Sequence, residues 1–400
     1  MNRLVARLPS SLAGAVAALP APWRAPLLIL GAAVPLALLA VGARGWGARA
    51  TRPRDAAADA LFRRLTAVDV LGAPACPAGA SCAELVRYAP APLEAEWAAR
   101  GQDFAGRECA QIVSEHALWQ AQLEGVVSTG GAGAGALGAG GTWSVMTYRD
   151  AATGAEASVA LEPLAGVMRD PRPVCAALEL RPREAARGLD SRDFTLLDPA
   201  FYRGVAAQLA APAHAAAAPA PPMGPEGRPR ALLFDLGATR WDPKHVTGMR
   251  WTVETYEGLG ISFDAIFAWE ATPIATTDFF GTMPLRLAAR THLFNVPVAR
   301  PGTGGVADAL AMLREVARPQ DFVVFKLDID TEVLEEEIAM ALLADDALAT
   351  RVDDFYFEHH SNTHGVMDQF WGTNAVRSLQ ESILLFSAFR RRGIRAHSWP

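Results

Sequence analysis

The chain has 400 residues, of which 51% are hydrophobic and 20% are charged. This length allows two domains of ordinary size, and this composition excludes a wholly disordered chain, a collagen-like repeat and a coiled-coil rod. The 37 basic and 43 acidic residues give a net charge of −6, so the chain lacks the basic excess typical of a nucleic-acid-binding protein.

The N-terminal part of the chain is cationic and then apolar. Seven arginines and no acid precede Asp55, and 19 uncharged residues separate Arg24 from Arg44. An apolar run of about 20 residues is long enough to span a membrane as a helix. We therefore expect a cationic tail over residues 1–25 and a single transmembrane signal-anchor over residues 26–43.

The same segment predicts where the rest of the chain resides. With a signal-anchor, the protein is a single-pass membrane protein whose main part lies in a lumen of the Golgi or ER type. Two alternatives involve cleavage: a signal peptide that ends at Ala48-Arg49-Ala50, or an arginine-rich, acid-free organelle transit peptide.

All four cysteines fall in the middle of the chain, at Cys76, Cys82, Cys109 and Cys175. An even number of cysteines after a membrane signal predicts disulfide bonds in an oxidising lumen, with the pairing left open. The spacing is not that of a zinc site. Four buried thiols are the alternative if the chain is cytosolic.

The region between the membrane segment and the Pro/Ala-rich linker, residues 44–211, is expected to be a lumenal stem or accessory region of mixed α/β structure. Residues 55–125 show helical periodicity. The Gly/Ala-rich stretch Gly130–Gly141 predicts a flexible loop, and the apolar runs Trp143–Tyr148 and Ser158–Leu164 predict strands. No residue of this region suggests a chemical role.

Residues 212–230 are rich in proline and alanine and predict a linker, and residues 231–400 show a different pattern. Five apolar runs predict strands over Ala231–Leu236, Phe263–Trp269, Leu293–Val298, Phe322–Leu327 and Asp354–Phe357. Helical patterns alternate with them over Thr247–Leu259, Val306–Val316, Glu332–Leu343 and Ala375–Arg391. Apolar strands that alternate with helices indicate an α/β domain with a doubly wound, mainly parallel sheet.

Most of these predicted strands end in an acid or in an acid beside a histidine. The residues concerned are Asp235, Glu270, Asp328 and Glu358, the last followed by His359. Ligands of open α/β sheets bind at the carboxyl ends of the strands, so we expect these side chains to share one crevice.

The first two strand ends suggest a nucleoside site. Gly237, followed by Ala238 and Thr239, allows a sharp turn after Asp235 and close approach of a ligand. Glu270 ends the next strand, where a carboxylate can accept hydrogen bonds from both ribose hydroxyls. The complete G-x-G-x-x-G fingerprint of dinucleotide-binding proteins is absent, which argues against NAD.

Three motifs fall in the order found in one known family. Phe234-Asp235-Leu236-Gly237-Ala238-Thr239, Ala268-Trp269-Glu270-Ala271-Thr272-Pro273 and Phe325-Lys326-Leu327-Asp328-Ile329-Asp330 resemble the D-x-G-A-N, F-E-P-x-P and K-x-D-x-E-G blocks of FkbM-like methyltransferases. These are class I, Rossmann-like enzymes that depend on S-adenosylmethionine (SAM). The resemblance covers residues 231–400, and it departs from the family at Thr239 and at Asp330-Thr331.

The resemblance implies roles for several residues. Asp235 and the turn at Gly237, Ala238 and Thr239 would face the methionine part of SAM, and Glu270 would hold its ribose. Lys326 and Asp328 would line the reaction site, Asp328 also beside the cofactor.

The implied reaction is methyl transfer to an oxygen of a sugar or another small hydroxylated acceptor, with no resident metal. His359 is a natural proton acceptor near neutral pH, so His359 or Asp328 is the expected base, with Glu358 beside them and Lys326 as an electrostatic partner.

Other interpretations remain open for the same residues. Asp328-Ile329-Asp330 is also typical of glycosyltransferases that hold Mn²⁺ and a nucleotide sugar. Asp330 also suits the N-cap of the following helix, and Glu358 with His359 or His360 and His364 could bind a metal. A third possibility is a non-catalytic relative of the methyltransferase fold.

Several other residues are expected to be structural. His397 lies in a predicted last strand, and the tryptophans Trp241, Trp251, Trp371 and Trp399 are expected to be core residues.

Overall fold

The computed structural model describes seven segments of the chain: residues 56–67, 83–100, 143–150, 153–162, 195–211, 228–362 and 377–399. All of them belong to one compact unit, residues 54–400. The expected membrane anchor, the four cysteines, the Gly/Ala-rich loop and most of the linker lie outside these segments. Within them, no helix is both long and apolar enough to cross a membrane.

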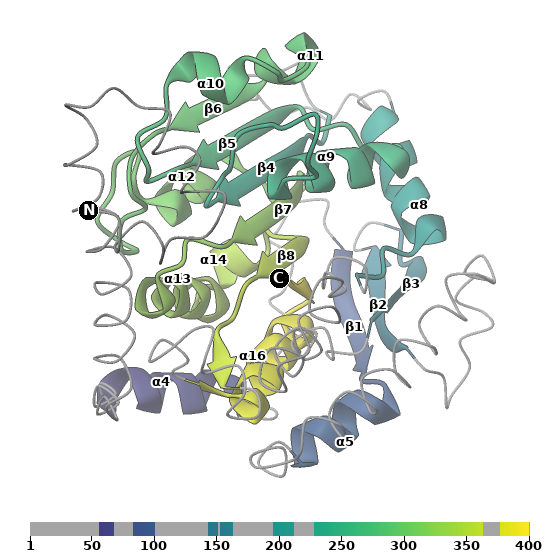
Figure 1. The fold of residues 1–400 in the computed structure, drawn as a ribbon. Helices are drawn as coiled ribbons and strands as arrows, with labels where there is room; N and C mark the ends of the chain where they lie inside the picture. Colours follow the sequence, from purple (N-terminus) through teal and green to yellow (C-terminus); the bar gives the residue numbers. More distant parts are fainter. Residues whose placement is uncertain are drawn as a thin grey trace, which may run out of the picture. The chain divides into compact units, whose positions relative to one another are not determined.

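A six-stranded parallel sheet forms the centre of this unit (Figure 1). Its order is β11-β8-β7-β4-β5-β6, and every neighbouring pair is parallel. The strands are β4 (Ala231–Leu236), β5 (Ala265–Trp269), β6 (Thr291–Phe294), β7 (Phe322–Leu327), β8 (Asp354–Phe357) and β11 (Arg395–Ser398). The predicted α/β fold with a parallel sheet is confirmed.

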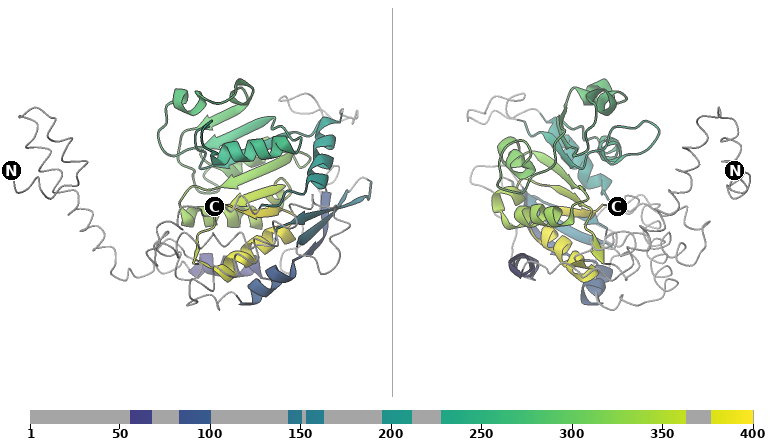
Figure 2. Two further views of the ribbon diagram at one scale, coloured as in Figure 1. Left: turned by 45° about the vertical axis from the view of Figure 1, so that its right-hand side comes forward. Right: turned by 60° about the vertical axis from the view of Figure 1, so that its left-hand side comes forward.

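Helices cover both faces of this sheet (Figures 1 and 2). One face carries α8 (Pro199–Ala210), α9 (Gly248–Gly258), α10 (Thr276–Phe280) and α11 (Leu285–Ala288). The other carries α4 (Ala56–Thr66), α12 (Ala309–Val316), α13 (Glu332–Ala344), α14 (Asp346–Ala349) and α16 (Leu379–Arg391). Both faces are apolar because side chains alternate along each strand: Phe234 packs on the α12 side, and Leu233 on the α9 side.

Two smaller sheets complete the described structure. β1 (Ala83–Ala89), β2 (Ser144–Asp150) and β3 (Glu156–Leu161) form an antiparallel sheet, and β9 (Ser361–Asn362) pairs with β10 (Arg377–Ser378). β1 corrects the helical prediction for residues 55–125, where helices are found only at α4 and α5 (Pro92–Arg100) among the described residues. β1 is half-buried and pairs with β2 through an irregular register at Leu85 and Arg87, so tertiary pairing overrides its helical pattern.

A buried ionic cluster joins α16 to the preceding segments. The Arg390 guanidinium is fully buried and lies 3.2 Å from Glu94 Oε2 of α5 and 3.4 Å from Glu162 Oε1, directly after β3. Glu162 also lies 2.8 Å from His397 Nδ1. Although burial opposes ionisation of Glu162, His397 and Arg390 hold its pKa below the usual value. His397 is thus buried in the last strand, β11 (Arg395–Ser398), as expected.

Candidate functional site

Three of the predicted site residues meet at the carboxyl ends of β4 and β7. Asp235 and Lys326 are register partners on these strands and are 0% and 1% exposed. Lys326 Nζ lies 3.1 Å from Asp235 Oδ1 and 3.0 Å from Asp328 Oδ2. Trp399 Nε1 donates to the same Asp328 oxygen at 2.9 Å, and the Lys326 ammonium lies 5.3 Å from the centre of a Trp399 ring. Trp399 is thus a core residue that also orients a site residue.

The charges of this group are strongly coupled. Burial raises the pKa of Asp235 above its usual value, against the opposing effect of Lys326. Burial also disfavours the Lys326 ammonium, but Asp235 and Asp328 outweigh it and raise the pKa of Lys326. Lys326 is therefore a cation held between two carboxyl groups. Asp235 Oδ2 is buried without a hydrogen-bond partner among the described residues.

The glycine turn after β4 is shaped by the neighbouring strand. Gly237 has a left-handed backbone (φ +81°), and a Cβ there would lie 1.4 Å from the carbonyl oxygen of Asp328. The amides of Gly237 and Ala238 both donate to Trp269 O, at 3.1 and 2.8 Å. The sequence predicted that a ligand would approach Gly237 closely, but in the structure the Asp328 backbone occupies that position. Ala238 is buried, whereas Thr239 is exposed.

Glu270 lies at an accessible part of the same edge. It is partly exposed, and its Oε1 accepts from the Thr272 amide at 2.6 Å. Asn295, directly after β6, holds this loop: its Nδ2 donates to Glu270 O and Thr272 O, and its Oδ1 accepts from Ile274 N. The sequence analysis missed Asn295. The negative charge of Glu270 contributes to the raised pKa of Asp235, which indicates that the two carboxylates are near one another.

A glycine-rich loop before α12 is bound to the end of β5, and the sequence analysis did not single it out. Asp308 Oδ2 accepts from the amides of Gly302 and Gly304, at 2.8 and 3.1 Å, while Oδ1 caps α12 at Ala311 N. Trp269 Nε1 donates to Val306 O at 2.8 Å, which ties the loop to the end of β5. An exposed backbone segment is therefore tied to the end of β5 at the carboxyl edge.

The structure places His359 apart from the Lys326 group. His359 Nδ1 lies 2.7 Å from Ser382 Oγ of α16, and the ring packs against Phe357 and Phe386. These partners belong to the α16 side of the sheet, whereas Lys326 contacts Trp399 on the α9 side. Burial lowers the pKa of His359 to about 3, so this imidazole is neutral at physiological pH.

The loops after β7 and β8 bring together a group of possible metal ligands. Asp330, Glu358 and His360 each offer a ligand atom, and these atoms all lie within 4.8 Å of one another. The N-cap of α13 is Thr331, so the interpretation of Asp330 as the cap is wrong. His364, the other candidate of this segment, lies outside the described residues.

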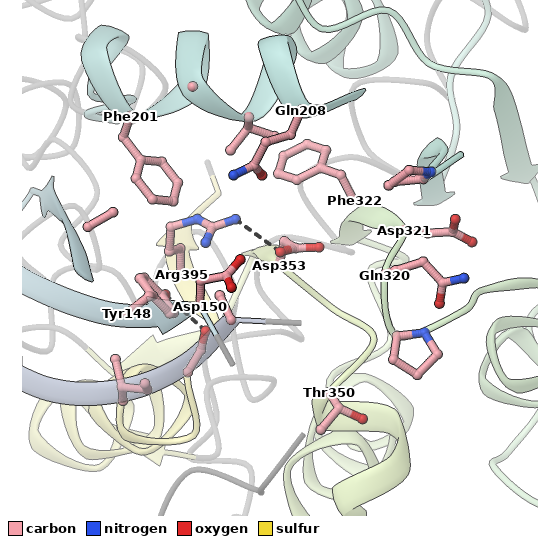
Figure 3. A pocket seen from close by; sticks show the side chains of 18 of the residues that line it. Tyr148, Asp150, Phe201, Gln208, Gln320, Asp321, Phe322, Thr350, Asp353 and Arg395 are labelled. Carbon is pink, nitrogen blue, oxygen red and sulfur yellow. Dashed lines mark hydrogen bonds and ion pairs between the residues drawn. The ribbon is translucent and has the colours of Figure 1, made fainter. Parts of the chain in front are cut away.

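A cavity of about 730 Å³ lies at the opposite ends of the strands (Figure 3). It is lined by residues of β1–β3, α8 and the amino ends of β7, β8 and β11. At its centre the buried Arg395 lies 2.6 Å from Asp354 Oδ1 and 3.5 Å from Asp353 Oδ1, and its guanidinium lies 5.0 Å from the Phe201 ring. This volume is typical of small-molecule sites. No sequence motif marks the cavity, because its lining comes from separate segments.

The comparisons with known proteins found no relative. No family model matches the chain, and no curated protein and no solved structure matches it. The resemblance to FkbM-like methyltransferases therefore depends on the motifs at three strand ends.

Proposed function

We propose that residues 231–400 form a Rossmann-like, SAM-dependent methyltransferase domain that acts on a hydroxyl group of a small acceptor such as a sugar. The observation that carries this proposal is the position of the Asp235–Lys326–Asp328 group. The sheet runs β4-β5-β6 in one direction and β7-β8-β11 in the other, and ligands of such sheets bind where the order reverses. That point lies between β4 and β7, where the three side chains meet.

The carboxyl edge offers groups that fit the cofactor. Asp235 Oδ2, buried without a described partner, suits the ammonium group of a methionine moiety. Glu270, partly exposed at the end of the adjacent strand, suits ribose hydroxyls. The amides of Gly237 and Ala238 are already used by Trp269 O, so we assign the turn to shaping the site.

The acceptor side of the reaction is assigned to Asp328. SAM supplies a methyl group that is already activated by a positively charged sulfur. Asp328 is the most exposed member of its group, with 23% of the side chain accessible against 1% for Asp235 and 2% for Lys326. We assign to its carboxylate the alignment and deprotonation of the acceptor hydroxyl, since Lys326 and Trp399 fix its position. His359 is not assigned this role, because it packs against α16.

The test is calorimetric titration of the full chain with SAM and with S-adenosylhomocysteine, without added metal. Loss of hydrogen bonds to a carboxylate costs about 1.5–3 kcal/mol each, so Glu270→Ala is expected to weaken binding by roughly 10-fold or more. Glu254→Ala, which removes an acid from α9 that pairs with Arg250, is the control and should bind as the wild type does. Absence of binding to the wild-type chain, or equal binding by Glu270→Ala, would refute the proposal.

A metal-dependent glycosyltransferase is a second candidate, because Asp330 belongs to a group of possible metal ligands. Asp328 is held by Lys326 and Trp399 and is not part of that group. Binding of a UDP-sugar that requires Mn²⁺ would favour this candidate. Binding of neither SAM nor a UDP-sugar would favour the non-catalytic relative.

A further inference from the structure

The group formed by Asp330, Glu358 and His360 has the composition of a metal centre. Glu358 and His360 follow β8 and are 5% and 4% exposed, while Asp330 follows β7 and is exposed. Asp330 has a left-handed backbone (φ 53°) and is the only non-glycine residue of the described segments with a positive φ. Aspartate tolerates this conformation better than most residues, so the turn between β7 and α13 brings its carboxylate to the group.

The two ring nitrogens of His360 have carboxylate neighbours on both sides. Nδ1 lies 3.0 Å from Glu332 Oε1, and Nε2 lies 3.4 Å from Glu358 Oε2. A histidine that binds a metal usually donates its other ring N–H to a carboxylate, which fixes the tautomer that binds. Glu332 is in the position to accept that hydrogen, and Nε2 then faces Glu358 as a lone-pair donor.

The 3.4 Å separation also agrees with the size of a zinc ion. Two ligand atoms that are each about 2.05 Å from a tetrahedral Zn²⁺ are roughly 3.3 Å apart. Asp330 offers the third ligand atom, which lies within 4.8 Å of the other two. Its side chain is exposed, so a change of rotamer can bring it to the ion.

A second, independent observation comes from Glu335 of α13. It is 1% exposed, and its Oε1 accepts from the Ile329 amide at 2.7 Å, between Asp328 and Asp330 in the chain. Its Oε2 is buried and has no hydrogen-bond partner among the described residues. Burial raises the pKa of Glu335 to about 7, and the nearby charges that act on it belong to His360, Asp328 and Glu332. Glu335 therefore places a buried carboxyl oxygen near His360, on the same helix as Glu332.

We propose that Asp330, Glu358 and His360 bind a divalent transition-metal ion, with Zn²⁺ as the best fit. One imidazole and two carboxylates suit zinc better than Mg²⁺ or Ca²⁺, which prefer oxygen ligands throughout. Three protein ligands leave a fourth position for water or for an oxygen of a substrate. This site differs from the Asp328–Asp330 pair expected of a glycosyltransferase, and it does not depend on SAM binding.

The experiment is titration of the metal-free full chain with Zn²⁺ in competition with a chelating dye. Asp330→Asn removes the charge and keeps a residue that tolerates the left-handed backbone. One tightly bound ion per wild-type chain is expected, and Asp330→Asn should weaken its binding at least 10-fold, because one of three protein ligands loses its charge. Glu332→Gln should weaken it by about 10- to 100-fold, as removal of a histidine's carboxylate partner usually does. Asp278→Asn, a change at an exposed acid of α10, should leave binding unchanged.

Two results would overturn the metal site. If the wild-type chain binds no Zn²⁺ stoichiometrically, or if Asp330→Asn and Glu332→Gln bind it as tightly as the wild type, the proposal is wrong. Other histidines or cysteines of the chain could bind zinc, but those ions would be insensitive to both variants. SAM titration of the metal-free chain separates failure of this site from failure of the methyltransferase proposal.

Discussion

At the scale of single residues, Gly237 shows how closely the loops of the carboxyl edge pack. Its φ is +81°, and a Cβ at this position would lie 1.4 Å from Asp328 O, so both the backbone and the space exclude a side chain. Gly237→Ala is therefore expected to lower the free energy of unfolding by about 3 kcal/mol or more, as the sum of left-handed strain and overpacking. Urea denaturation of the full chain measures this loss.

Gly302→Ala is the matched control for that substitution. Gly302 has a φ of +85°, but a Cβ there would meet no atom within 4 Å. Only the left-handed strain of about 1–2 kcal/mol remains. Equal losses for the two variants would show that contact with the Asp328 backbone does not determine the need for glycine at position 237.

A second residue-scale prediction concerns pH and Asp353 in the cavity of Figure 3. Burial raises the pKa of Asp353 from 3.8 to about 6, so between these values the folded state binds more protons than the unfolded state does. Stability then falls as pH rises through this window, and the deficit is constant above it. Asp353→Asn keeps an acceptor for the Val323 amide and removes the deficit.

The expected gain of Asp353→Asn is about 1 kcal/mol above about pH 6 and none below about pH 4, after allowance for solvent screening. The allowance is needed because 34% of the side chain is exposed. Chemical denaturation from about pH 4 to about pH 8 measures it, with Asp278→Asn, a change at an exposed acid of α10, as the control. A gain that is the same at both ends of this range would contradict the assignment.

The sequence predicted that Asp235 and Asp328 would share one crevice, because each lies at the end of a continuous apolar strand of a parallel sheet. Only the resemblance to the methyltransferase family placed Lys326 beside them. It did not predict the side of the sheet on which each residue lies. His359 has the same alternation as Phe357, which packs on the α16 side. Because residues two apart in a strand point to the same face of the sheet, the position of His359 could have been predicted from that of Phe357, and it lies outside the crevice. The sequence also could not predict that Glu335 Oε2 is buried without a hydrogen-bond partner among the described residues. Burial of an acid on a helix depends on tertiary packing.

At the scale of elements, α16 is held to the rest of the unit by Arg390. This guanidinium also donates to Ala396 O and Glu162 O, so it links β11 and β3 as well. Arg390→Met would leave Glu94 and Glu162 buried without their cation, at an expected cost of about 3–5 kcal/mol. Arg149→Met, which breaks the exposed pair between Arg149 of β2 and Glu156 of β3, should cost less than about 1 kcal/mol. Guanidinium denaturation compares the two, and similar costs would contradict the structural role of the cluster.

The elements best predicted are those that the sheet buries on both faces. β4, β7 and β8 have the predicted bounds, because each is a continuous apolar run with every residue buried. β1 was missed because its half-buried and exposed residues do not alternate regularly. α8 was not predicted at all. The helix begins after Asp198, whose side chain accepts hydrogen bonds from the amides of Ala200 and Phe201. Pro199 is the first helical residue, a position at which proline is favoured.

At the scale of the whole molecule, the sequence indicated the α/β class and the parallel sheet from the alternation of strands and helices. It did not indicate how residues 83–211 engage the sheet. Tyr202 of α8 donates to Asp354 at the start of β8 at 2.9 Å, and Glu94 and Glu162 reach Arg390. Such contacts join polar groups that are far apart in the chain, and the pattern of residues in one sequence does not predict which distant groups will pair.

The two partners of Arg390 precede it by 296 and 228 residues. Contacts with such separations form slowly, because the entropy of closing a long loop is lost before the contact stabilises anything. The parallel pairing of all six strands adds further distant contacts of the same kind. The chain is therefore expected to be a slow folder whose rate depends on topology, and while it folds, unpaired strand edges and the apolar face of α16 remain exposed to self-association.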